Sequence, residues 1–213
     1  MVMYTIKKQL LKEDHRVRPG GSFEKYSITI HSTGNGTSTA QNERDWLDNP
    51  KNYREAGWHY VVGDGIVIQA IPDREAAWHC GVTAGNRFSI GIEITESGDR
   101  GRVLETAAAF TADKLRELRL TAKDLKTHKD WSGKECPRIL IQKGYIKDGM
   151  DWDWFVKRVK AFSKEEDAMT TAEAKDIIRE RCGFDDNTMK YLEFYRYGDS
   201  LIQRLAEAMI LDK

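Results

Sequence analysis

The amino-acid sequence predicts an α/β fold in which helices flank a central mixed β-sheet, followed by a small α-helical domain. Short runs that alternate apolar and polar residues, typical of half-buried strands, are mixed with segments of helical spacing. Two of these runs are separated by Gly63-Asp64-Gly65, which favours a β-hairpin. The elements show no regular strand–helix–strand alternation, so a wholly parallel sheet is not expected.

The individual elements follow from local patterns. Residues 24–31 alternate and end at His31, so we expect a strand whose carboxyl end presents an imidazole. Ser38 or Thr39 can cap a helix that runs to about Leu47. The remaining expected elements are a hairpin over 58–62 and 66–71, a strand over 88–95, helices over 104–118 and 151–162, and a short segment over 125–129.

The chain divides into a larger first part and a helical tail. We expect one domain over residues 1–163, a polar linker over 164–169 and a small helical domain over 170–213. Within the tail, Thr170-Thr171 resembles a capped helix start, and Gly183 is expected to end that helix. Apolar residues then recur at helical intervals, at Leu192, Tyr195, Leu201, Ile202, Leu205 and Met209.

Composition excludes several classes of partner. The 34 Lys and Arg residues balance 34 Asp and Glu residues, so nothing favours nucleic acid or an anionic membrane. No run approaches the roughly 18 apolar residues that a membrane-spanning helix needs. The N-terminus lacks the features of a signal peptide, and three cysteines are an odd number, which disfavours a disulfide framework. We therefore expect synthesis in the cytoplasm and reduced thiols.

The segment His128-Lys129-Asp130-Trp131-Ser132-Gly133-Lys134-Glu135-Cys136-Pro137 is the most informative part of the chain. It places an imidazole and a thiol eight residues apart, and Pro137 restricts the backbone of the cysteine. Together with His31, these side chains offer two nitrogens and one sulfur, a set that suits Zn²⁺ and leaves a fourth position for water. Convergence of the three would make the protein a zinc hydrolase.

Other assignments compete with this hypothesis. Cys136 could instead be a nucleophile paired with His128, although His31 and Glu93 would then have no role. Glu93 interrupts an apolar strand and could be a general base beside a metal, or alternation could point it to solvent. Lys134 could stabilise an oxyanion or be an exposed surface lysine.

Two further histidines and three tryptophans lie near these segments in the sequence. His59 and His79 could replace a metal ligand, but we interpret them as residues behind the ligands or in a substrate groove. Trp58, Trp78 and Trp131 could belong to the core or could stack on sugar rings in a glycan groove.

Five motifs together resemble a known family. They are His31-Ser32-Thr33, Trp58-His59-Tyr60, Ala77-Trp78-His79-Cys80-Gly81, the run from Asn86 to Glu93, and the segment from His128 to Arg138. They occur in the order seen in type 2 N-acetylmuramoyl-L-alanine amidases, which include phage endolysins and peptidoglycan recognition proteins. The resemblance covers about residues 20–160 and is greatest to endolysin amidases of Bacillus phages.

This resemblance implies a specific site and substrate. Zinc would be held by His31, His128 and Cys136, with Glu93 as the catalytic carboxylate and Lys134 as the catalytic lysine. The implied substrate is bacterial peptidoglycan, cut at the amide that joins N-acetylmuramic acid to L-alanine. An endolysin of this kind would leave the infected bacterial cell through a holin pore and act on the cell wall.

Two positions depart from the family pattern. Some relatives use a tyrosine where Trp58 stands, so Glu93 must carry the proton transfer here. Cys80 replaces an alanine and is expected to be a small packed residue and not a ligand.

The tail lies outside the resemblance, and we expect it either to anchor the protein to the wall or to form a homodimer. Two other functions are possible alternatives. The protein could bind muropeptide without catalysis, which the presence of Cys136 disfavours, or it could regulate another protein.

Overall fold

The computed structural model describes residues 4–13, 15–167 and 171–194, together with residues 202, 205, 206 and 209. The chain separates into two compact units, Met1–Ser163 and Lys164–Lys213.

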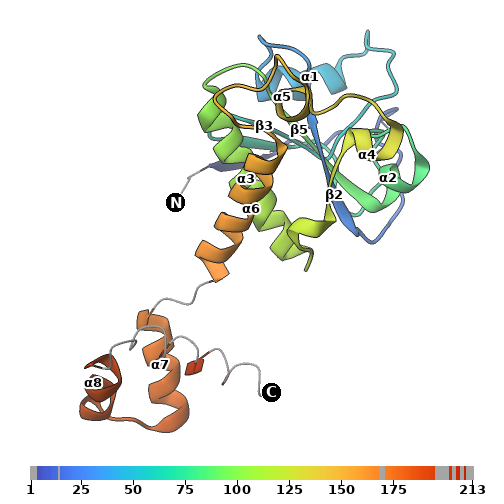
Figure 1. The fold of residues 1–213 in the computed structure, drawn as a ribbon. Coiled ribbons are helices and arrows are strands. Elements are labelled where there is room, and N and C mark those ends of the chain that lie inside the picture. The colour runs from blue at the N-terminus through green and yellow to red at the C-terminus, as the bar shows by residue number, and fades with distance from the viewer. Residues whose placement is uncertain are drawn as a thin grey trace. The chain divides into compact units, whose positions relative to one another are not determined.

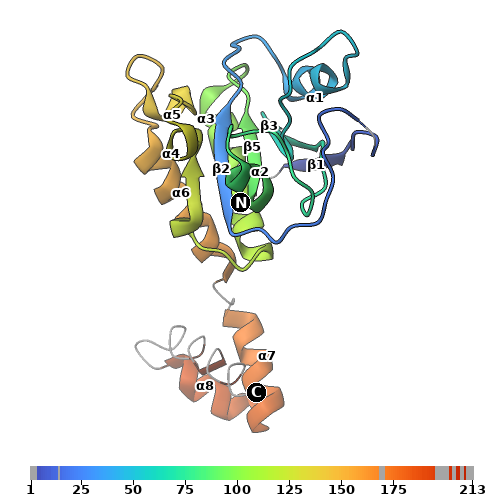
Figure 2. The ribbon, with the colours of Figure 1, turned by 90° about the vertical axis from the view of Figure 1, so that its right-hand side faces the viewer.

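The described part of the first unit contains a six-stranded mixed sheet (Figures 1 and 2). Its order is β1-β4-β3-β5-β2-β6. The neighbouring strands pair in parallel except β3 and β4, which form the predicted antiparallel hairpin. The strands are β1 (Thr5–Lys8), β2 (Ser27–Ser32), β3 (Tyr60–Gly63), β4 (Ile66–Gln69), β5 (Ser89–Ile94) and β6 (Leu125–Thr127).

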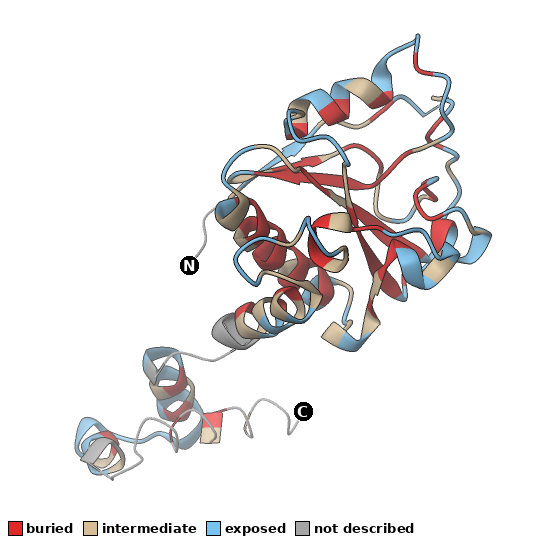
Figure 3. Ribbon diagram, turned by 45° about the horizontal axis from the view of Figure 1, so that its top comes forward, coloured by how far each residue is buried: buried red, intermediate tan, exposed pale blue. Residues whose placement is uncertain are grey.

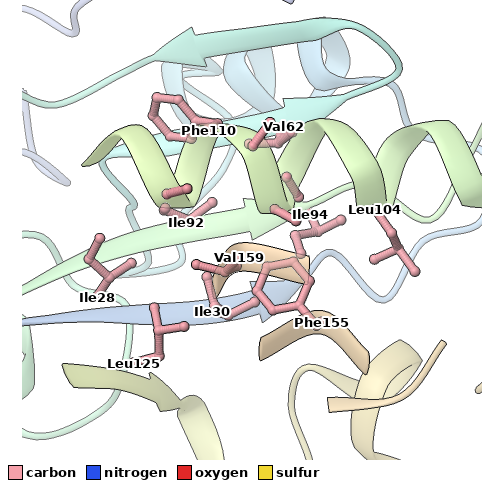
Figure 4. Close-up of a cluster of buried hydrophobic side chains, with 14 of the residues drawn as sticks. Ile28, Ile30, Val62, Ile92, Ile94, Leu104, Phe110, Leu125, Phe155 and Val159 are labelled. Carbon is pink, nitrogen blue, oxygen red and sulfur yellow. The ribbon is translucent and has the colours of Figure 1, made fainter. Parts of the chain in front are cut away.

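One face of the sheet is covered by α3 (Arg100–Glu117) and α6 (Trp152–Asp167). Alternate residues of β2 and β5 point into this layer because successive side chains of a strand face opposite ways. Figure 4 shows the resulting core, in which both helices pack on the strands. Its labelled members are Ile28, Ile30, Val62, Ile92, Ile94, Leu104, Phe110, Leu125, Phe155 and Val159.

The opposite face carries a second apolar cluster and α1 (Ala40–Asp48), which packs on β3 and β4. Figure 3 shows buried residues along the strands and on one side of each covering helix. Shorter helices follow the strand ends: α2 (Thr83–Phe88), the 3₁₀ turn Ala122–Asp124, α4 (His128–Ser132) and α5 (Arg138–Ile141). The mixed sheet with flanking helices confirms the predicted fold class.

Three boundaries differ from or refine the sequence predictions. Thr39, and not Ser38, caps α1 by accepting a hydrogen bond from the Asn42 amide. Helix α3 begins at Arg100 because Asp99 caps it, four residues before the predicted start. Helix α6 continues to Asp167, so residues 164–167 of the expected linker are helical. Their polar composition is also compatible with helix.

The second unit contains α7 (Thr171–Cys182) and α8 (Asp186–Phe194). Gly183 follows α7 with a φ of 66°, so the residue predicted to end this helix has a left-handed conformation. Tyr195 and Leu201 lie outside the described residues. The unit has its own buried cluster, formed by Ala174, Ile178, Met189, Ile202 and Ala206. Within the described parts of the chain, no helix has both the length and the apolar character needed to cross a membrane.

The contact between α6 and the sheet predicts a large stability effect at Phe155. This side chain is fully buried in the larger cluster, so Phe155→Ala should lower the free energy of unfolding by about 3–5 kcal/mol. Lys157→Ala on the exposed side of the same helix should change it by less than about 0.5 kcal/mol. Urea denaturation measures the free energy of unfolding of both variants. Equal midpoints for wild type and Phe155→Ala would contradict the packing described here.

Candidate metal centre

His31 lies near the carboxyl end of a central strand. It belongs to β2, between β5 and β6, and is buried on the face opposite α3 and α6. Its register partner in β5 is Glu93, so the imidazole and the carboxylate are on adjacent strands and on the same face. The strand pairing therefore brings together two of the predicted site residues.

His128 reaches the same edge from the neighbouring strand. Thr127, the last residue of β6, pairs with Ile30 of β2, so the next residue lies beside His31. Thr127 also caps α4 reciprocally with Asp130, which fixes the turn from strand to helix. Trp131 then donates a 2.8 Å hydrogen bond from Nε1 to Thr29 Oγ1 and ties the helix to β2.

The loop after α4 brings Cys136 to the same edge of the sheet as His31 and His128. Gly133 ends the helix with a φ of 77°, a left-handed conformation that glycine adopts readily. The Lys129 amide donates to the Cys136 carbonyl at 3.2 Å. The Ser32 amide donates to Cys136 Sγ at 3.5 Å, so the end of β2 contacts the sulfur directly.

The three predicted ligands converge. His31 Nδ1 lies 3.0 Å from His128 Nδ1 and 3.8 Å from Cys136 Sγ. One ligand atom from each residue lies within 4.8 Å of the other two. Metal–nitrogen and metal–sulfur bonds of about 2.0 and 2.3 Å in a tetrahedral site place such atoms about 3.3–3.6 Å apart. The buried cluster could therefore hold a metal ion.

Burial determines the protonation of these groups. It lowers the pKa of His128 to about 4, with Lys134 adding to the effect, and lowers the pKa of His31 well below its usual value. Both imidazoles are thus neutral at pH 7 and keep a lone pair for a metal. Burial, then the charge of Glu93, raises the pKa of the Cys136 thiol to about 12, so a bound cation must displace its proton.

The cluster opens into a pocket of about 500 Å³. Glu93 and Lys134 both line it. The Oε2 atom of Glu93 is buried and has no hydrogen-bond partner among the described residues. Burial, then the charge of Glu43, raises the pKa of Glu93 to about 8, while Lys134 opposes this rise. The pocket thus contains a carboxyl group that can exchange a proton near neutral pH.

Aromatic side chains form another part of the pocket. Trp58 and Trp78 line it, as predicted for the groove, and Trp58 stacks on Trp46 with a centroid distance of 5.8 Å. Trp46 and Glu43 were not predicted here, because only the packing of α1 against β3 and β4 brings them to this face. Their helical spacing was the available signal, and it indicated only a helix.

The two additional histidines differ in position. His79 lines the pocket and lies behind His31, with Nδ1 3.0 Å from His31 Nε2. His59 is fully buried and is not among the residues that line the pocket; its ring lies 5.8 Å from that of His79, which agrees with the predicted position behind the ligands better than with a groove. Its Nδ1 accepts a hydrogen bond from the Gly91 amide, and its Nε2 contacts the Glu75 carbonyl. Both ring nitrogens therefore have backbone partners, as expected for a structural histidine. Cys80 is buried, its thiol does not belong to the cluster, and its backbone hydrogen-bonds to His128.

Comparison with known proteins decides the family. The sequence model of the N-acetylmuramoyl-L-alanine amidase family matches residues 25–139, which include the cluster, Glu93 and Lys134. The chain belongs to this family. N-acetylmuramoyl-L-alanine amidase CwlH of Bacillus subtilis (strain 168) is 35% identical over 146 residues, 65% of this chain and 58% of CwlH. The chain spans about half the length of the curated relatives it matches first.

Solved structures of amidases share the fold. The catalytic domain of XlyA is 32% identical with a TM-score of 0.65, over 73% of this chain and 99% of that domain. A mutant endolysin from Bacillus subtilis is 32% identical with a TM-score of 0.66, over 74% of this chain and 99% of that one. The family resemblance inferred from the five motifs is thus confirmed.

The geometry of the cluster predicts that metal retention depends on Cys136. Cys136→Ser should sharply reduce bound metal, because a serine hydroxyl is a far poorer metal ligand at neutral pH than a thiolate. Metal analysis after equilibration with a weak chelator measures the change. Cys182→Ser, at an exposed thiol of the second unit, should leave metal content unchanged. Wild-type metal content in Cys136→Ser would refute the ligand assignment.

Proposed function

We propose that this protein is a zinc-dependent N-acetylmuramoyl-L-alanine amidase that hydrolyses bacterial peptidoglycan. One observation carries this function: the ligand atoms of His31, His128 and Cys136 lie within 4.8 Å of one another beside an open pocket. Membership of the amidase family supports the substrate, which is the amide between N-acetylmuramic acid and L-alanine.

The donor set supports zinc as the metal. Two imidazole nitrogens and one thiolate are typical zinc ligands, and three protein ligands leave a position for water or substrate, as in catalytic zinc sites. When bound, zinc would supply a Lewis acid that polarises the scissile carbonyl and lowers the pKa of water. His31 and His128 would hold it as neutral ligands, and Cys136 would balance part of its charge.

Glu93 is assigned the proton transfers. Its buried Oε2 has no protein hydrogen-bond partner among the described residues and is therefore available to a water molecule. The carboxylate takes a proton from the attacking water and returns it to the departing amine of L-alanine. A pKa raised to about 8 before metal binding suits a group that must both accept and release a proton near neutral pH.

Lys134 is assigned to charge stabilisation. Lys134 lines the pocket two residues before Cys136, and this supports a role for its ammonium beside the carbonyl that develops negative charge. Its charge already lowers the pKa of His128 and opposes the raised pKa of Glu93. The same charge would favour an oxyanion in the pocket.

The pocket walls fit a glycopeptide. Trp58 and Trp78 offer aromatic surface for a sugar ring or for the apolar parts of a stem peptide. Similarity to an endolysin structure supports action on the cell wall. Release through a holin pore is part of the same proposal. The helical unit would then serve either wall anchoring or homodimer formation, and sedimentation of the full chain with and without the residues after 162 distinguishes these roles.

Product analysis on purified cell walls tests the activity. Hydrolysis should release new L-alanine amino termini without new reducing sugars. A strong chelator should stop the reaction, and a stoichiometric addition of Zn²⁺ should restore it. New reducing ends would identify a glycosidase, and full activity in the chelator would rule out metal dependence.

Replacing Glu93 tests the proton-transfer assignment. Glu93→Gln keeps the shape of the side chain but cannot accept the proton, so the hydrolysis rate should fall by about 10²-fold or more while metal content stays the same. Glu135→Gln, at an exposed carboxylate one residue before Cys136, should be near wild type. A Glu93→Gln variant with an unchanged rate on cell walls would exclude the carboxylate from the mechanism.

A further inference from the structure

We propose that His79 is a positioning residue that fixes the tautomer of His31 and so presents the unprotonated Nδ1 of His31 to the metal. The inference rests on the proposed metal site. Its basis is a buried contact of 3.0 Å between His31 Nε2 and His79 Nδ1, on the side of the His31 ring that faces away from His128.

The two nitrogens of His31 have different surroundings. Nδ1 faces His128 Nδ1 and Cys136 Sγ, so this is the atom that would bind a metal. A neutral imidazole carries one proton, and a metal at Nδ1 requires that proton on Nε2. The Nε2–H group then donates to His79 Nδ1, which must accept. When His79 Nδ1 accepts this hydrogen bond, His31 therefore has the tautomer that can bind a metal at Nδ1.

The reverse tautomer opposes metal binding. If His79 donated from Nδ1, His31 would have to accept at Nε2 and carry its proton on Nδ1. That proton would point at His128 Nδ1 and occupy the lone pair that the metal needs. Ligand histidines in metal sites are commonly oriented by such a partner at the second nitrogen. Here the partner is another histidine.

The fold holds the His79 ring firmly in this place. The ring lies over Gly91 of β5, where an added Cβ would be only 2.7 Å from His79 Cγ. Asn86 Oδ1 accepts from the amides of His79 and Cys80, both at 3.0 Å, and fixes the backbone that carries the ring. Gly91 and Asn86 thus keep the acceptor in position behind His31.

A purely structural role would require only that the ring fill its space, whereas positioning requires an acceptor atom. His79→Leu removes the acceptor, while His79→Asn keeps an amide oxygen at the place of Nδ1, where it can accept from His31 Nε2. Zinc affinity measured by chelator competition should fall about 10- to 100-fold in His79→Leu and recover substantially in His79→Asn. Denaturation midpoints of both variants separate loss of affinity from loss of folding. Equal zinc affinity in wild type and a folded His79→Leu would overturn the proposal.

Nitrogen NMR of the wild-type chain provides a test that needs no variant. In the zinc-loaded protein, His31 should carry its proton on Nε2, with a scalar coupling across the hydrogen bond to His79 Nδ1. A proton on His31 Nδ1, or zinc at Nε2, would overturn the proposal while leaving the proposed activity intact. Failure of the wild-type chain to bind zinc at all would instead refute the metal site itself, and this inference with it.

Discussion

The parallel pairing of β2 with β5 and β6 is the constraint on which the site depends. Parallel strands end at the same edge of a sheet, so the next-to-last residues of β2 and β5 and the residue that follows β6 meet there. Those residues are His31, Glu93 and His128. They come from segments up to 97 residues apart in the chain and need no long loop to meet. Only Cys136 is brought in by a loop.

The same pairing separates stability from chemistry. One face of β2 and β5 supplies isoleucines to the core under α3 and α6, and the other supplies polar residues to the site. The site groups on this polar face are buried, and their pKa values therefore shift toward the neutral forms. A cation entering the cluster would meet neutral imidazoles and a protonated thiol, and would be held by displacing one proton.

The sequence was most informative where a residue type had a single chemical use. The His–Cys spacing, the lysine two residues before the thiol and the histidine at a strand end indicated a metal site as one hypothesis, and the resemblance to the amidase family selected it; the cluster in the structure has these residues. Alternation in β2 and β5 similarly predicted the sheet and the strand that carries Glu93.

The sequence was less informative where tertiary packing alone decided the outcome. His59 and His79 each follow a tryptophan and were given the same two possible positions, yet the His59 ring is enclosed by backbone groups and the His79 ring contacts a proposed ligand. Glu43 and Trp46 join the pocket only because α1 packs on β3 and β4. The polar residues at 164–167 indicated a linker, but such residues also occur in helices, and here they continue α6.

X-ray absorption spectroscopy of the zinc-loaded chain tests the central claim most directly, since it reports which atoms surround the metal. A site made by His31, His128 and Cys136 predicts a first shell with one sulfur at about 2.3 Å and two imidazole nitrogens at about 2.0 Å, completed by a light atom. A shell without sulfur, or with a single imidazole, would contradict the convergence of these three side chains on one ion.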